Sequence, residues 1–139
     1  MKEKQNNRRG LIFVFAILFL IIAVSVANAR VERNYKNTVA EHINMVIDSI
    51  DFRDDLTRVY ARMIGRPHTS QKIERVEMRV AADRFEATDI DGVDFKRWFQ
   101  WEDDGVIPVE IDFKAMAPVK SGTLIVETAR GVDSINFTL

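Results

Sequence analysis

Two histidines are the residues of this chain whose type is best suited to metal binding or acid–base chemistry. His42 lies beside Glu41 on an expected helix, and His68 follows a Gly-Arg-Pro turn close to Ser70. A zinc site needs several ligands at short spacing, and a serine nucleophile needs a base that is held by a third group. Neither histidine has such neighbours in the sequence, so we expect both to be structural or solvated residues.

A second pattern, D-I-D-G-V-D at residues 89–94, has the aspartates of a calcium-binding loop. An EF-hand loop requires oxygen ligands and a glycine at fixed spacings, which this segment does not supply. A capped turn explains the same residues. The chain also has no cysteine, which excludes disulfides, thiolate metal sites and a cysteine nucleophile. We therefore predict no metal, no cofactor and no enzymatic activity.

An aromatic group between residues 95 and 101 is the most distinctive local feature. Phe95, Trp98 and Phe99 recur at helical spacing, and Trp101 lies at the flank of that face. Partly exposed tryptophans are common anchors of protein interfaces. Trp101 is therefore a candidate interface residue, with packing against its own sheet as the alternative.

The elements that position these residues begin with an apolar run at residues 11–29, which has thirteen Leu, Ile, Val or Phe side chains and no charge. A helix of this length reaches roughly 28 Å, close to the hydrocarbon thickness of a bilayer. We predict a transmembrane signal-anchor. The first ten residues carry a net charge of +3 and the remainder −4. Residues 1–10 are therefore expected in the cytoplasm, and the domain beyond the single span in the periplasm or at the cell exterior. The periplasmic alternative is the topology of a single-pass protein of the bacterial inner membrane.

Two processing events are alternatives to an uncleaved anchor. The motif A-N-A at residues 27–29 fits a cleavable secretory signal, which would release a periplasmic protein after Ala29. The start of the chain also resembles that of type IV pilins and pseudopilins, which would be processed between Gly10 and Leu11 to give a minor pseudopilin. That family expects Glu at the fifth position after the glycine, where this chain has Phe15.

Residues 30–50 are predicted to form a juxtamembrane helix. Apolar residues recur there every three or four positions, which places them on one narrow stripe of a helix. Such a stripe is typical of a seam between helices, so its members are candidate interface residues: Val31, Tyr35, Val39, Ile43, Ile47 and Ile50. The period then slips, and we predict a second helix that ends at Ile64, with one continuous helix as the alternative.

The segment 51–139 is predicted to be a small ferredoxin-like domain. Alternating apolar residues indicate strands over 73–80, 84–90, 107–113 and 123–128, with room for an extra C-terminal strand over 135–139. The aromatic segment between the second and third strands is expected to be a helix that Asp94 and Gly105 cap. The resulting order, αββαββ, is that of a ferredoxin-like plait, so the predicted fold class is α+β.

The segment DGVDFKRWFQWEDDGVIPVEIDF, followed by APVKSGTLIVE, is similar to the C-terminal domain of the M subunit of type II secretion systems. Phe95, Trp98, Gly105 and Val106 lie where that pattern places them. The O-type inner-membrane alignment protein of type IV pilus machines shares the architecture. This resemblance covers about residues 71–128 and the membrane topology. It implies a non-enzymatic scaffold that forms a homodimer and pairs with a second bitopic inner-membrane protein with a similar periplasmic domain.

Together these features predict an assembly component of a type II secretion or type IV pilus-like machine, in contact with the lipid bilayer. The acidic balance of the larger part, without a basic block, argues against nucleic acid as a partner. A minor pseudopilin and a secreted periplasmic protein are the alternatives.

Overall fold

The structure, a computed structural model, describes residues 30–139. In this part of the chain eleven strands form two antiparallel sheets, and no helix is present. The strands are β1 (Arg30–Arg33), β2 (Lys36–Asn37), β3 (Asn44–Phe52), β4 (Leu56–Ile64), β5 (Ser70–Val80), β6 (Asp83–Glu86), β7 (Asp89–Asp91), β8 (Trp98–Gln100), β9 (Val106–Lys114), β10 (Ser121–Thr128) and β11 (Gly131–Thr138).

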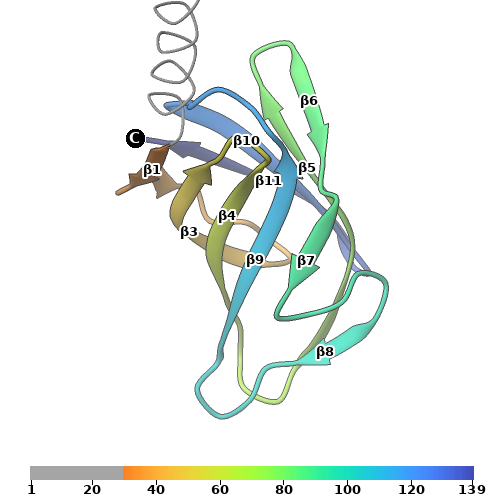
Figure 1. Cartoon of the computed structure of the whole chain (residues 1–139). Helices are drawn as coiled ribbons and strands as arrows, with labels where there is room; N and C mark the ends of the chain where they lie inside the picture. Colours follow the sequence, from red (N-terminus) through yellow and green to blue (C-terminus); the bar gives the residue numbers. More distant parts are fainter. Residues whose placement is uncertain (1–29) are drawn as a thin grey trace, which may run out of the picture.

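The two sheets pack face to face as a β-sandwich (Figure 1). Sheet A has the order β1-β3-β4-β9-β7, and sheet B has the order β2-β11-β10-β5-β6. The short strand β8 also belongs to sheet B, because it pairs with the first residues of β5. One hydrophobic cluster contains inward-facing residues of both sheets, so the sandwich has a single core between its layers.

Alternation of apolar and polar residues along the long strands builds this core. In β9, Val109, Ile111 and Phe113 are buried, while the residues between them are more exposed. The same alternation in β3, β4, β5, β10 and β11 adds the other large buried side chains, among them Met45, Ile50, Phe52, Met63, Ile73, Met78, Leu124, Ile135 and Phe137. Burial of one face of each sheet therefore fixes the register of its strands.

The predicted juxtamembrane helix over residues 30–50 is wrong, because this segment forms β1, β2 and most of β3. Over the last part of this segment, from Ile43 to Ile50, the helical spacing arises from a register shift in the pairing of β3 with β4 between Ile47 and Ser49. Inward-facing residues two apart give a spacing of four from Ile43 to Ile47, and the irregularity gives a spacing of three from Ile47 to Ile50. Spacings of three and four between apolar residues, which are typical of a helix, can therefore also arise from alternate core residues of an irregular strand.

The second predicted helix, which ends at Ile64, is also wrong, because its residues form β4. Thr57 and Ala61 are inward-facing members of β4, and their weakly apolar side chains hide the alternation that Val59 and Met63 continue. The conformation of such a segment is decided by its pairing with other strands, here β3 and β9, and not by its local propensity or pattern.

The predicted helix over the aromatic segment is absent as well. Lys96 has a φ of +64°, in the left-handed region, and Trp98 begins the three-residue strand β8. Without its helices the chain is neither α+β nor a ferredoxin-like plait, and the correct class is all-β. The strands predicted over 73–80, 107–113, 123–128 and 135–139 are present as parts of β5, β9, β10 and β11. The strand predicted over 84–90 is instead divided between β6 of sheet B and β7 of sheet A.

Among residues 30–139 there is no helix that is long and apolar enough to cross a membrane. This finding contradicts the predicted localisation as a single-pass protein of the inner membrane with a periplasmic domain. The predicted cytoplasmic segment 1–10, the predicted span 11–29 and both processing sites, after Gly10 and after Ala29, lie outside the described residues.

Candidate interaction site at the edge of sheet B

The edge of sheet B is interrupted between β6 and β8. The chain leaves this sheet after Glu86, forms β7 at the edge of sheet A and returns to sheet B at Trp98 (Figure 1). As a result, β6 covers residues 77–80 of β5 and β8 covers residues 70–72. The part of β5 between these two pairings has no neighbouring strand of its own sheet on that side.

A β-bulge lies in this uncovered part of β5. In the pairing with β10, Arg75 is opposite Glu127 and Ile73 is opposite Thr128, so Glu74 is an extra residue on β5. Glu74 and Arg75 are both half-exposed, whereas the next residue, Val76, is fully buried. The bulge thus keeps two successive charged side chains out of the core, and bulges commonly redirect side chains in this way next to functional sites.

A cleft of about 590 Å³ occupies the interruption, and we call it the edge cleft. Its apolar lining comes from β5 and from the two crossing segments of the chain: Val76, Ala87 and Phe95. Its charged lining carries both signs: Glu74, Arg75, Glu86, Lys96 and Glu127. A concave, partly apolar surface with a few charged groups is typical of a binding site.

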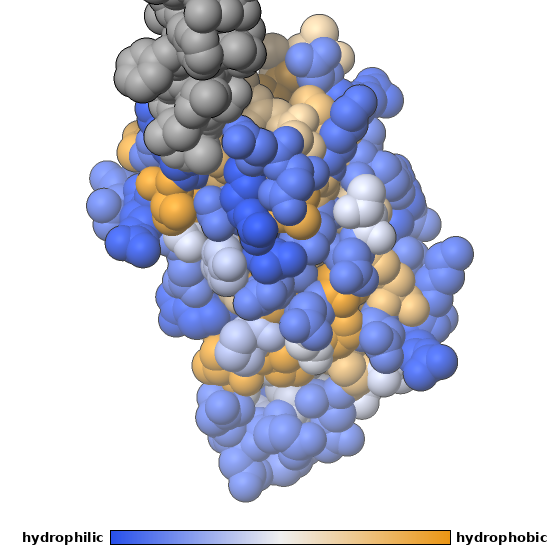
Figure 2. All heavy atoms as spheres, in the orientation of Figure 1, coloured by the Kyte–Doolittle hydropathy of each residue, from blue (hydrophilic) through white to orange (hydrophobic). Residues whose placement is uncertain are grey.

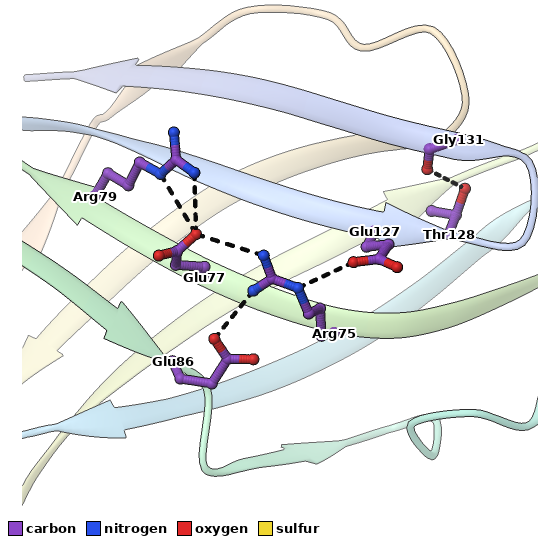
Figure 3. Close-up of polar contacts among 7 residues, drawn as sticks. All are labelled: Arg75, Glu77, Arg79, Glu86, Glu127, Thr128 and Gly131. Carbon is purple, nitrogen blue, oxygen red and sulfur yellow. Dashed lines mark hydrogen bonds and ion pairs between the residues drawn. The ribbon is translucent and has the colours of Figure 1, made fainter.

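Arg75 is the centre of the charged lining (Figure 3). Its Nε donates to Glu127 at 2.9 Å, its Nη1 donates to Glu86 at 3.0 Å, and its Nη2 lies 3.7 Å from Glu77. Arg79 also donates to Glu77, at 3.3 Å. The hydrogen bond to Glu127 is the largest cause that raises the pKa of Arg75 above its ordinary value. Carboxylates from β5, β6 and β10 therefore fix this guanidinium across three strands.

The hydroxyl of Thr128 closes the turn at the end of β10 with two hydrogen bonds. The Thr128 hydroxyl donates to the carbonyl oxygen of Gly131 at 3.0 Å (Figure 3). The same hydroxyl accepts from the backbone N–H of Arg130 at 3.2 Å. This turn holds the end of β10 in position beside the bulge of β5.

Lys96 is held in a strained backbone conformation at the opposite wall of the edge cleft. Its backbone N–H donates to the carbonyl oxygen of Ile73 at 2.8 Å, which ties the returning chain to β5. A left-handed conformation costs a non-glycine residue roughly 1–2 kcal/mol, so a lysine here is unfavourable for folding alone. The nearby carboxylates pair elsewhere: Glu74 with Lys72, and Glu86 and Glu127 with Arg75.

Trp98 is the exposed aromatic residue beside the edge cleft, with 59% of its surface accessible. It lies directly opposite Lys72 across the pairing of β5 with β8, and the Lys72 ammonium is 5.3 Å from the centre of the indole. Lys72 also pairs with Glu74 at 3.0 Å. Directly opposed residues share one face of a sheet, so Trp98 and the edge cleft face the same side.

The opposite outer face of the sandwich has a different character. On sheet A, Arg58 forms two hydrogen bonds to Asp112, at 2.7 and 3.0 Å, and Arg62 pairs with Asp48 at 2.9 Å. Figure 2 shows mostly hydrophilic residues on the face that it presents, with hydrophobic residues in separate groups. Exposed ion pairs of this kind contribute little to stability.

The structure places the predicted interface residues in two environments. Tyr35, Ile43, Ile47 and Ile50 belong to the core and are at most 7% exposed. Val31 and Val39 are on the surface, 49% and 79% exposed. These residues do not form a common stripe, because the helix that would align them is absent.

Trp101, the predicted aromatic anchor, is buried. Only 5% of it is exposed, and its indole N–H donates to the carbonyl oxygen of Met63 at 3.1 Å. Sequence analysis missed Trp98 because a helical period placed it in the core. An alternating period over residues 98–101 would have placed Phe99 and Trp101 inward and Trp98 outward.

The residues that suggested chemistry have structural partners. His42 contacts the buried Asp133, and the exposed His68 lies 2.8 Å from Asp103. In the aspartate-rich turn, the backbone N–H of Gly92 donates to Asp91 at 3.1 Å. Among residues 30–139, no group of three His, Cys, Asp or Glu side chains could hold a metal ion.

Comparisons of the chain with protein-family models, with curated proteins and with solved structures find no match. The function proposed below therefore depends on the geometry of the chain itself.

Proposed function

We propose that this β-sandwich is a non-enzymatic protein-binding module, which acts in the assembly of a larger complex through the edge cleft. The observation that carries the proposal is the position of Trp98, an exposed tryptophan on a three-residue edge strand, beside a cleft of about 590 Å³. Exposed tryptophans and clefts with apolar floors are typical energetic centres of protein interfaces.

Three further features support this location. The bulge at Glu74, the left-handed backbone of Lys96 and the crossing of the chain between the sheets all lower local regularity, and all meet at the edge cleft. Positive φ angles also occur at Asn34, His68 and Ala81, so the coincidence of the three features at one place, and not strain alone, supports a site here. The role within a secretion or pilus-like machine, which the resemblance implies, stays a prediction.

A peptide selection tests the proposal. The immobilised full chain is offered a phage-displayed library of random peptides, and the same selection is made on Trp98→Ala. We expect a consensus sequence on the native chain and at least tenfold weaker enrichment on the variant, since truncation of a central interface anchor costs about 2 kcal/mol or more and a tenfold change corresponds to about 1.4 kcal/mol. Arg62→Ala, on the outer face of sheet A, is the matched control and should retain the enrichment.

The absence of a consensus would contradict the proposal, and so would a consensus that Trp98→Ala binds equally well. Far-ultraviolet circular dichroism of each variant establishes that the sandwich is intact before binding is compared.

A further inference from the structure

The anchor and the cleft lie side by side on one face of the molecule. Lys72 lies between Trp98 and the edge cleft. It contacts the indole of Trp98 and forms an ion pair with Glu74 of the cleft lining. Lys96, two residues before Trp98, lines the cleft as well. The indole of Trp98 does not line the edge cleft of the same molecule, and it is mostly exposed.

Two copies of a face that carries an exposed side chain, here Trp98, beside a cleft can pair with each other. Rotation of a second molecule by a half turn, about an axis between the two features, places each anchor over the cleft of the other molecule. If the anchor and the cleft were on opposite faces, the same contact would generate an open chain of molecules. Their position on one face allows a closed dimer.

The geometry points to a second copy of this chain as the partner that occupies the edge cleft: Trp98 of each copy inserts into the cleft of the other. This inference rests on the proposed function and specifies its partner. Ala87 and Phe95, which are both partly exposed, offer the inserted indole an apolar surface. The volume of the edge cleft lies within the range of small-molecule binding sites, which are larger than one indole.

The charges of this face agree with a symmetric contact. Both signs are present around the edge cleft and along the outer side of β5: Lys72, Arg75, Arg79 and Lys96, with Glu74, Glu77, Glu86 and Glu127. The exposed Arg84 lies opposite Arg79 on the same face. A face of one sign would repel its own copy, whereas a face of mixed sign can pair with itself. Glu86, whose side chain is 60% exposed, and Lys96, which lines the opposite wall, are the charges best placed to meet a partner.

Disulfide cross-linking of the full chain tests the contact directly, because the native chain has no cysteine. Two differently tagged copies, one with Trp98→Cys and one with Ala87→Cys, are mixed and oxidised. We expect a product that joins the two tags, at a yield at least tenfold above that of Trp98→Cys mixed with Arg62→Cys. Arg62 lies on the outer face of sheet A, outside the proposed contact. Equal yields for the two mixtures would overturn the inference.

Charge reversal provides a second test that keeps Trp98. Lys96→Glu makes the face acidic and Glu86→Lys makes it basic, so each variant alone should form about tenfold less dimer than the native chain when dimer is quantified by sedimentation of the full chain. A mixture of the two variants should recover the dimer as a mixed species. Failure of the mixture to recover, together with no cross-link from residue 98 to residue 87, would exclude the second copy. A peptide consensus that still depends on Trp98 would then leave the proposed function standing with a different partner.

Discussion

The carboxylate of Asp133 holds His42 by its ring and by its backbone. One oxygen lies 2.8 Å from Nδ1 of the imidazole, and the other accepts the backbone N–H groups of His42 and Ile43 at 2.9 and 2.7 Å. Asp133 is 4% exposed and comes from β11, ninety-one residues further along the chain. The pair therefore closes the loop between β2 and β3 onto sheet B, which is a structural role for both residues.

Replacement of Asp133 by alanine should destabilise the fold more than replacement of His42. Asp133→Ala leaves two backbone N–H groups without an acceptor, at about 1–3 kcal/mol each, whereas His42→Ala removes one side-chain contact worth about 1 kcal/mol. Urea unfolding measures both free energies. Equal losses in the two variants would show that the backbone hydrogen bonds to Asp133 are not what stabilises this loop.

Tyr35 should make stability sensitive to alkaline pH. Its hydroxyl donates to the carbonyl oxygen of Val119 at 2.6 Å, and burial raises its pKa from 10.0 to about 12, with a further contribution from Glu32. The native state holds this proton more tightly than the unfolded state. The stabilising contribution is therefore complete below pH 10 and is lost as the pH rises from 10 to 12.

The Tyr35→Phe variant separates this effect from other alkaline titrations. At neutral pH it should be about 1 kcal/mol less stable than the native chain, and that difference should shrink between pH 10 and 12. The chain has two tyrosines, so absorbance titration of Tyr60→Phe follows Tyr35 alone. A midpoint near 10 in the folded protein would contradict the burial of this hydroxyl.

Ala81→Gly should stabilise the protein. Ala81, in the turn between β5 and β6, is exposed and has a φ of +52°, where an L side chain is strained and glycine is not. Relief of that strain exceeds the entropy that glycine adds to the unfolded chain, so we expect a net gain of about 0.5–1 kcal/mol. Ala82→Gly in the same turn is the matched control and should reduce stability, because Ala82 is not among the residues with a positive φ. A loss of stability in both variants would rule out the strain.

Truncation of the two tryptophans should change the unfolding free energy by very different amounts. Trp101→Ala removes a buried ring that packs on Gly65 and should cost about 3–5 kcal/mol of unfolding free energy. At a protein concentration low enough for the chain to be monomeric, Trp98→Ala removes an exposed ring and should change stability by less than about 0.5 kcal/mol. Chemical unfolding monitored by circular dichroism compares them without dependence on fluorescence. A large loss for Trp98→Ala would mean that this residue serves the fold and not an interface.

Removal of one carboxylate from the edge strand β7 should reduce the electrostatic repulsion between β7 and β9 and so stabilise the fold. Asp89 and Asp91 lie directly opposite Asp112 and Glu110 of β9, and like charges in this arrangement are unfavourable. Asp91→Asn should therefore stabilise the chain by about 0.2–1 kcal/mol at low ionic strength and by less at high salt. Asp112→Asn should do the reverse, because it breaks the bidentate pair with Arg58. The charges also protect this edge from pairing with another sheet, so Asp91→Val should increase aggregation.

The sequence was sufficient to predict strands with strict alternation and β-branched residues. Ile107 to Phe113 alternates strictly and lies in β9, and the apolar, β-branched run from Thr123 to Thr128 lies in β10. It was not sufficient for β3, where the register shift produced helical spacings, or for β4, where Thr57 and Ala61 weakened the apolar pattern. In these strands the pairing with distant segments decides the conformation, and no local pattern reports it.

The edge cleft could not be predicted for a related reason. Its walls come from segments that precede β7 and follow it, and they meet only because the chain crosses from sheet B to sheet A and returns. The bulge at Glu74 likewise depends on the register with β10. The aromatic group suggested one partly exposed tryptophan, but the helical period selected Trp101, which is buried, instead of Trp98, which is exposed.

A concentration series of the full chain, followed by the amide and indole N–H resonances in NMR spectra, tests the central claim most directly. The account predicts that the Trp98 indole resonance shifts with concentration, together with amides of residues 74–76, 86–87 and 95–98. The Trp101 indole, whose N–H is donated to Met63 inside the core, should stay unchanged. A Trp98 resonance that does not move, or shifts confined to the outer face of sheet A around Arg58 and Arg62, would contradict the claim that the edge cleft is the interaction surface of this protein.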